Sequence, residues 1–166
     1  MTRSTILPLA LALVAAGSVM EAQAQTAAVT VDTAAAKAGI TALRAQYATL
    51  QKAGDVAGLV SLYTEAATLD AFGAPSMHGR TAVEAGLKAQ MTGRKYTVAE
   101  ITAVNTAIRS NEAWSEIGTY HDMYVMAGKM NHEWGRYVVG NAKGSDGKWR
   151  ITYLMSFPDS TKVDKK

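Results

Sequence analysis

The residue pattern changes once along this chain, near Tyr96, and that change constrains the fold more than any other feature. Before it, apolar residues recur at spacings of three and four, the period of an amphipathic helix. After it, the chain is rich in Val, Ile, Thr, Tyr and Trp, and short polar or Gly-containing turns divide it. These segments predict strands over Tyr96–Ser110, Ala113–Met126, Met130–Ala142 and Trp149–Phe157. Helices followed by an antiparallel strand meander predict an α+β domain.

The segment before this change predicts three helices and one short strand. The first helix covers residues 33–53 and ends at Gly54, and the aspartate that follows caps a short second helix. A strand over residues 67–72 leads into a Gly- and Pro-containing loop. Thr81, with Glu84 three residues later, has the spacing of a capping box and predicts the start of the third helix.

The first 24 residues have the organisation of a secretory signal peptide. Arg3 supplies a basic start, an apolar run covers Ile6–Ala16, and an A-x-A motif ends at Ala24. We expect four parts: a signal peptide over 1–24, a linker over 25–31, a single domain over 32–158 and a polar basic tail over 159–166. The mature chain is therefore expected to be periplasmic or secreted, with no membrane association after signal cleavage.

Composition argues against several classes of function. The 17 Lys and Arg residues against 14 Asp and Glu give a net charge of only +3, without the clustered basic face that nucleic-acid binding needs. No cysteine is present, which excludes disulfides and thiol nucleophiles. The three histidines lack the spacing of metal ligands, and no Gly-rich phosphate loop occurs. We expect no metal, no cofactor and no nucleic-acid partner.

Both faces of the predicted strands carry apolar or aromatic side chains. On the second long strand, Trp114, Tyr120 and Tyr124 alternate with Ile117 and Met123. A sheet with two apolar faces needs a cover on each side. The helices cover one face, and we expect the other to pack on a second copy of the chain, giving a homodimer through the sheet.

Several stretches resemble one known superfamily. They are QYATLQKAGDVAGLVSLYTEAATL at 46–69, HGRTAV at 78–83, GTY at 118–120, GRYVV at 135–139 and DGKWRI at 146–151. Together they resemble the nuclear-transport-factor-2-like superfamily, and within it the SnoaL-like and ketosteroid-isomerase-like members and a branch of bacterial exported domains. The resemblance covers roughly residues 36–157. It implies a cone, in which a strongly curved antiparallel sheet wraps around the long N-terminal helix and encloses a pocket, with dimers formed through the sheet.

The resemblance to ketosteroid isomerase implies two catalytic residues. Its oxyanion-hole tyrosine lies seven residues before the Gly-Asp corner, which matches Tyr47. Its general base lies in an Asp-Pro-Phe-Gly segment that is similar to residues 70–73, but this chain has one residue fewer before it. Counting from the strand start places the base at Ala71, and counting back from Phe72 places it at Asp70. A one-residue shift reverses the face of a strand side chain, so the direction of Asp70 stays open. The isomerase's second carboxylic acid has no match here.

The other candidate ligand-binding residues are aromatic, basic or imidazole side chains near the expected pocket: Tyr63, Phe72, His78, Trp114, Tyr120, Trp134 and Arg136. Each has a structural alternative. The aromatic rings can pack in the core or at the dimer interface, Tyr47 can be a core residue, and Arg136 can pair with Glu116 or Glu133. Asp70 can bond the adjacent loop instead of acting as a base with a raised pKa.

Two functions fit this pattern. In the first, which we favour, an exported dimeric domain binds a small apolar or amphipathic molecule in an apolar pocket. In the second, an acid–base enzyme of the isomerase or hydratase type uses Asp70 as base and Tyr47 as electrophile. An interaction module is a third alternative. The first two differ in one structural respect, which is whether the Asp70 carboxyl and the Tyr47 hydroxyl share a cavity.

Overall fold

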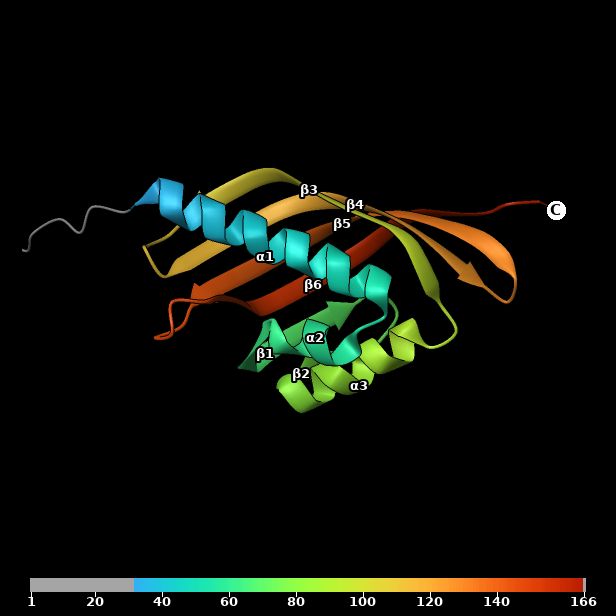
Figure 1. Cartoon of the computed structure of the whole chain (residues 1–166), viewed down its shortest axis with the longest axis horizontal. Helices are drawn as coiled ribbons and strands as arrows, with labels where there is room; N and C mark the ends of the chain where they lie inside the picture. The colour runs from blue at the N-terminus through green and yellow to red at the C-terminus, as the bar shows by residue number, and fades with distance from the viewer. Residues whose placement is uncertain (1–31, 166) are drawn as a thin grey trace, which may run out of the picture. The chain divides into compact units, whose positions relative to one another are not determined.

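A computed structural model describes residues 32–165, so the signal peptide and linker expected over 1–31 lie outside the described residues. The order of elements is α1 (Thr33–Ala53), α2 (Val56–Ser61), β1 (Tyr63–Ala71), β2 (Met77–His78), α3 (Arg80–Met91), β3 (Lys95–Ile108), β4 (Ala113–Met126), β5 (Lys129–Lys143) and β6 (Trp149–Val163). Figure 1 shows the helices early in the chain and the four long strands after them. The α+β class predicted from the sequence is confirmed. Among the described residues, none of the helices has the length and hydropathy to cross a membrane.

The strands form one sheet in the order β2-β1-β6-β5-β4-β3. The four long strands are an antiparallel meander, as their turn residues predict. β1 pairs in parallel with β6, which closes the N-terminal half of the chain onto the last strand. β6 continues beyond Phe157 to Val163 and stays paired with β5, through the segment expected as a polar tail.

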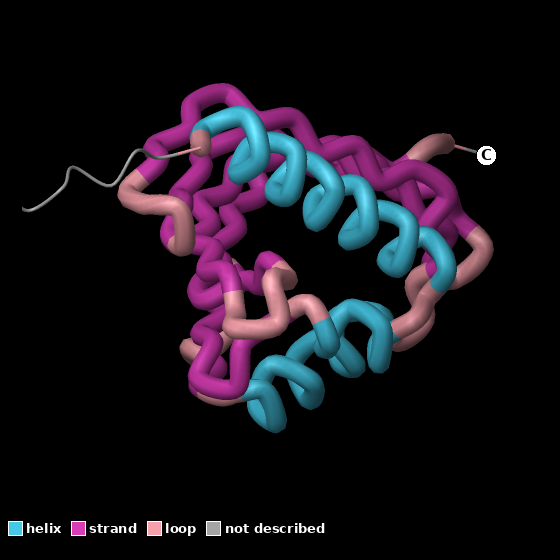
Figure 2. Tube along the Cα trace, turned by 60° about the vertical axis from the view of Figure 1, so that its left-hand side comes forward, coloured by secondary structure: helices cyan, strands magenta, loops and turns pink. Residues whose placement is uncertain are grey.

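Helix α1 lies along the concave side of the sheet, and the two shorter helices lie at the β1 end (Figure 2). The main core joins these elements through Leu43, Leu59, Leu69, Val83 and Tyr137, among others, and all of them are buried. A smaller cluster holds the start of α1 against β4 and the first residue of β6. There a Cβ on Gly39 would lie 2.4 Å from the Trp149 ring, so only glycine lets the helix approach so closely.

The corner between α1 and α2 forms as the sequence predicts. Gly54 has a left-handed φ of 70°, and its N–H bonds back to carbonyls of the last turn of α1. Asp55 then caps α2 by accepting a hydrogen bond from the Gly58 N–H at 2.8 Å. This sharp turn fixes the end of α1 above the sheet.

The capping-box prediction for α3 is wrong. The helix begins at Arg80, its N-cap is Gly79, and no side-chain cap bond is made in the described structure. Gly79 has a φ of 81° and its N–H bonds to the Ala67 carbonyl at 2.8 Å, which ties the chain to β1 before the helix starts. Glu84 pairs with Lys88 on the exposed side of the helix instead of with Thr81.

Candidate functional site

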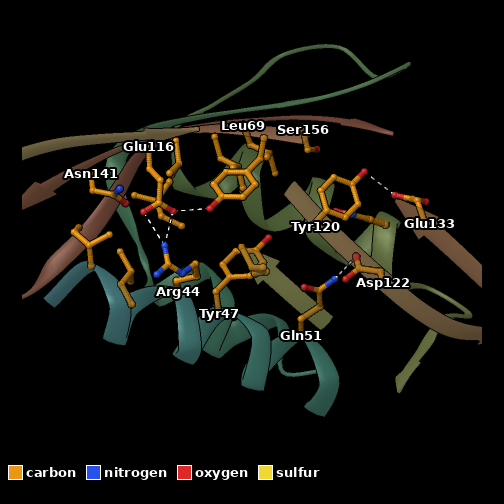
Figure 3. A pocket seen from close by; sticks show the side chains of 18 residues that line it. Arg44, Tyr47, Gln51, Leu69, Glu116, Tyr120, Asp122, Glu133, Asn141 and Ser156 are labelled. Carbon is orange, nitrogen blue, oxygen red and sulfur yellow. Dashed lines mark hydrogen bonds and ion pairs between the residues drawn. The ribbon is translucent and has the colours of Figure 1, made fainter. Parts of the chain in front are cut away.

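A cavity of about 110 Å³ lies between α1 and the concave face of the sheet, and we call it the helix–sheet cavity. Figure 3 shows its 18 lining residues. Its apolar wall comes from five elements, α1, β1, β3, β5 and β6, and includes Leu43, Leu69, Ile101, Val139 and Leu154. A cavity of this size holds several waters, and it approaches the roughly 150 Å³ of an engineered apolar cavity that binds benzene.

Two periodicities bring polar side chains into this cavity. Arg44, Tyr47 and Gln51 recur along one face of α1. Alternate residues of β4 point inward, which places Glu116, Tyr120 and Asp122 opposite that helical face.

One end of the cavity holds the Arg44 cluster, which consists of Arg44, Glu116 and Tyr137. Arg44 Nη1 donates to both Glu116 carboxylate oxygens at 2.7 Å, and the Tyr137 hydroxyl donates to Glu116 Oε1 at 2.5 Å. Glu116 is only 3% exposed, so the two donors offset the loss of its hydration. Burial and the neighbouring Glu116 carboxylate raise the pKa of Tyr137, so it stays a neutral donor.

Asp122 lies near the other end of the cavity and is 7% exposed. Gln51 Nε2 donates to its Oδ2 at 2.8 Å (Figure 3). Its other oxygen, Oδ1, is buried and has no hydrogen-bond partner among residues 32–165. Burial raises the pKa of Asp122 from 3.8 to about 7; the Gln51 hydrogen bond opposes the rise and the Glu133 carboxylate adds to it. A carboxyl that titrates near neutral pH can give or take a proton.

Glu133 lies opposite Asp122 on β5 and completes this end of the cavity. It accepts a hydrogen bond from the Tyr120 hydroxyl at 3.0 Å, and Arg94 Nη1 lies 3.9 Å from its Oε2. The Arg94 guanidinium also lies over the Tyr124 ring, 4.6 Å from the centroid. Burial and the adjacent Glu133 raise the pKa of Tyr120.

Reciprocal glycines position the two tyrosines of the sheet. Tyr120 pairs across the strands with Gly135, and Tyr137 pairs with Gly118. A Cβ on Gly135 would lie 2.4 Å from the Tyr120 ring, and one on Gly118 would lie 2.5 Å from the Tyr137 ring. The two Gly-x-Tyr sequences on antiparallel neighbours therefore let each ring lie over the opposing strand, with its hydroxyl reaching a cavity carboxylate.

Tyr47 lines the middle of the cavity from α1. Burial raises its pKa to about 12, with the nearby Tyr63 hydroxyl acting in the opposite direction, so it is a neutral hydroxyl at physiological pH. Burial also raises the pKa of Tyr63, which packs in the core behind it. Tyr47 can thus offer a hydrogen bond to an oxygen atom of a molecule in the cavity.

A wider outer hollow of about 690 Å³ adjoins this cavity, between the β1–β2 loop, α3 and the ends of the strands. The two share Leu69, Gln90, Tyr120, Glu133 and Ser156 as lining residues. The shared residues show that the two spaces are adjacent.

A family model for the SnoaL-like domain matches residues 32–155 of this chain. The chain belongs to the SnoaL-like domain family. This membership agrees with the resemblance drawn from the sequence. No curated protein sequence matches the chain significantly.

Solved structures share the fold of this SnoaL-like domain at low sequence identity. A ketosteroid isomerase-like protein from Erwinia carotovora atroseptica SCRI1043 has a TM-score of 0.66 at 16% identity, covering 74% of this chain and 95% of its own. A protein of unknown function from Mycobacterium tuberculosis has a TM-score of 0.65 at 21% identity, covering 74% and 71%. A hexachlorocyclohexane dehydrochlorinase from Novosphingobium barchaimii LL02 has a TM-score of 0.65 at 15% identity, covering 79% and 91%. These similarities show that this chain has the same cone-shaped fold.

Within residues 32–165, two of the site residues predicted from the sequence line the helix–sheet cavity, namely Tyr47 and Tyr120. Asp70 is not among the described lining residues. On β1 the cavity-lining residue is Leu69, and Asp70 lies on the opposite face, where its carboxyl interacts with Tyr153 of β6. Asp70 and Tyr47 therefore do not share this cavity.

The other predicted residues lie elsewhere in the SnoaL-like domain. Tyr63 is fully buried in the main core, and Trp114 is buried in the smaller cluster. Phe72 is 74% exposed at the outer hollow, and exposed His78 contacts the Thr68 hydroxyl at 3.2 Å. Trp134 and Arg136 lie on the outer face of β5, where Trp134 stacks on His121 and Arg136 pairs with Asp159. Arg136 pairs with neither Glu116 nor Glu133 in the described structure, in contrast to the expected alternative.

Sequence reasoning missed most of the polar cavity residues, including Arg44, Gln51, Glu116, Asp122 and Glu133. A signal for two of them is present. Glu116 and Asp122 have the same alternation phase as the aromatic residues of β4, so charged groups interrupt a face that is otherwise aromatic. Because carboxylates are seldom buried without a partner, their presence on such a face marks a candidate functional site.

Proposed function

We propose that the SnoaL-like domain binds one small molecule in the helix–sheet cavity. The observation that carries this proposal is the composition of the cavity wall, which has an apolar middle and a polar group at each end. An amphipathic molecule fits such a wall better than a wholly apolar one, because the carboxyl of Asp122 keeps an unpartnered oxygen within the described structure. Cyclic compounds appear in the names of proteins that share the fold, including hexachlorocyclohexane dehydrochlorinase, which supports a ring-sized ligand.

Binding in the cavity can be tested with benzyl alcohol as a neutral, ring-sized probe. Saturation-transfer NMR should detect its binding to the wild-type protein. Ile101→Trp places a large ring in the cavity and should abolish the signal, because Ile101 lines the wall from β3. Val104→Trp is the matched control on the same strand, since Val104 is 71% exposed and its substitution should leave binding intact. Unchanged binding in Ile101→Trp would contradict the proposal.

A second candidate function is acid–base catalysis, and the position of Asp122 favours it. The carboxyl is buried in the cavity and has a pKa of about 7, so it can accept a proton from a bound substrate at neutral pH. Tyr47 lines the same cavity and stays protonated, so it can donate a hydrogen bond to an oxygen that gains negative charge. In this scheme Asp122 takes the role of base that the sequence resemblance gave to Asp70.

Proton abstraction can be measured as deuterium uptake next to the carbonyl of cyclohexanone in D₂O. The catalysed rate should rise through about pH 7, where Asp122 ionises, and Asp122→Asn should lose it. Tyr47→Phe should lower the rate without removing the pH dependence. A rate that Asp122→Asn leaves unchanged would exclude the base role.

Export and dimerisation are further parts of the proposed function. The N-terminal sequence supports export to the periplasm or secretion. A homodimer is supported by the outer face of the sheet, where Ile117 is 51% exposed and Trp134 is 36% exposed. Both lie on the face opposite the helix–sheet cavity, so a second copy could cover them without blocking the cavity.

A further inference from the structure

The helix–sheet cavity has an excess of negative charge. Among the described residues that line it, Glu116, Asp122 and Glu133 carry carboxyl groups and Arg44 alone carries a positive charge. That guanidinium is already bound to Glu116 through two short hydrogen bonds. Asp122 and Glu133 therefore remain as an adjacent acidic pair, and their nearest cationic group, Arg94, lies 3.9 Å from Glu133.

The hydrogen-bonding groups of the cavity also favour a ligand that donates a hydrogen bond. Four lining side chains already donate to these carboxylates: Arg44 and Tyr137 to Glu116, Gln51 to Asp122, and Tyr120 to Glu133. The buried Oδ1 of Asp122 still lacks a donor within the described part of the chain. A buried acceptor without a partner costs about 1–3 kcal/mol, so a ligand that donates to it gains affinity.

The aromatic lining favours a positive charge as well. Tyr47, Tyr120 and Tyr137 all contribute rings to the wall. The face of an aromatic ring attracts a cation, and the attraction strengthens when both are removed from water. Next to the cavity such a contact is already present, because the Arg94 guanidinium lies over the Tyr124 ring.

We propose that the ligand of this cavity is a small organic cation, a protonated amine on a ring-sized carbon skeleton, with its ammonium group at Asp122 Oδ1. The inference rests on the proposed binding function and specifies its ligand class. The ammonium donates to the orphaned oxygen and offsets the charge of ionised Asp122, while Arg94 lies beside Glu133. The carbon skeleton occupies the apolar middle between Leu69, Ile101 and Leu154.

This assignment predicts a particular pH dependence. The groups that face Asp122 are Gln51 and Tyr47 from α1, Glu133 from β5, Arg94 before β3, and Tyr96, Tyr120 and Tyr124 from β3 and β4. The tyrosines remain neutral across the neutral range, and Arg94 remains charged, so Asp122 dominates the titration there. With a pKa of about 7 in the free protein, Asp122 is mostly neutral at about pH 6 and mostly ionised at about pH 8. The affinity for an ammonium ion should rise about tenfold over that interval.

The test compares benzylamine, benzyl alcohol and benzoate, which share one ring and differ in the polar group. Calorimetric titration of the full-length chain should give the tightest binding for benzylamine at about pH 8, with the tenfold loss at about pH 6. Benzyl alcohol should bind more weakly with little pH dependence, and benzoate should bind least, because the cavity is acidic. The amine stays protonated throughout this range, so any change in its affinity reports on the protein.

Asp122→Asn should lower benzylamine affinity at least tenfold at about pH 8 and remove its pH dependence, so that benzylamine no longer binds more tightly than benzyl alcohol. Asp146→Asn is the matched control, because Asp146 is an exposed carboxylate paired with Arg150 away from the cavity, and it should leave all three affinities unchanged. Benzyl alcohol or benzoate binding as tightly as benzylamine would overturn the cation assignment alone. If none of the three probes binds, the proposed binding function is overturned with it.

Discussion

Replacing Asp122 by Asn should stabilise the protein at high pH, although the substitution removes a cavity carboxyl. Asn has nearly the same shape, and its side-chain oxygen can still accept the hydrogen bond from Gln51. The folded-state pKa of Asp122 lies above its unfolded value, so the folded state holds the proton more tightly than the unfolded state. The contribution of the Asp122 carboxyl to the free energy of unfolding is therefore most favourable below about pH 4, and it is lost as the pH rises through about 7.

The size of this effect follows from the two pKa values. They are 3.8 for the ordinary carboxyl and about 7 for Asp122, and each pH unit between them corresponds to about 1.4 kcal/mol. The ionised carboxyl thus lowers the free energy of unfolding by at most about 4 kcal/mol, and relaxation around the charge reduces this to about 2–4 kcal/mol. Asp122→Asn lacks this penalty, so its advantage should grow from near zero at about pH 4 to about 2–4 kcal/mol at about pH 8.

Urea unfolding of both proteins at several pH values between those limits measures the difference directly. Asp146→Asn serves as the control. The salt bridge with Arg150 lowers the pKa of Asp146, so the ionised form of this carboxyl stabilises the folded state instead of destabilising it. That variant should never be more stable than the wild type. A difference between Asp122→Asn and wild type that does not change with pH would refute the reasoning, and so would a wild type that is the more stable protein at about pH 8.

Three further outcomes are expected. Arg44→Met leaves the Glu116 carboxylate buried without its cation and should lower the free energy of unfolding by about 3–5 kcal/mol. The double variant with Glu116→Gln should recover part of this loss, and urea unfolding measures both variants. A loss under about 1 kcal/mol in Arg44→Met would contradict a stabilising role for the Arg44 cluster. Gly118→Ala places a Cβ 2.2 Å from a backbone carbonyl oxygen and against the Tyr137 ring, so it should lower the free energy of unfolding by about 1–3 kcal/mol. Circular dichroism should show a lower melting temperature, and an unchanged one would be inconsistent with the close strand contact. Ile117→Lys on the outer face should shift the sedimentation velocity of the protein from dimer to monomer, and a wild type that sediments as a monomer would rule the dimer out.

The helices and long strands were predictable because their signals are local. The end of α1 at Gly54 follows from the conformational freedom of glycine, and the four long strands follow from their turn residues. β2 was missed because it has only two residues and is defined by its pairing with β1. The start of α3 was misplaced because a tertiary bond from Gly79 to the Ala67 carbonyl overrides the local capping pattern.

The cavity was predictable only in part, because side-chain direction in a strand depends on register. Along β1 the buried residues Tyr63, Ala67 and Leu69 share one face, so Asp70, one residue further on, lies on the other. The sequence contains the alternation that places Asp122 with Tyr120 but does not reveal which sheet face is concave. Only the packing of α1 against that face identifies Asp122 as a cavity residue.

The most direct test of the account is the titration of the Asp122 side chain by carbon-13 NMR, first in the free protein and then with saturating benzylamine. We expect a pKa near 7 in the free protein and a clear downward shift when the amine binds, because the ammonium favours the ionised carboxyl. A free-protein pKa close to that of an ordinary aspartate, or one that benzylamine leaves in place, would contradict the central claim that the helix–sheet cavity is a binding site organised around Asp122.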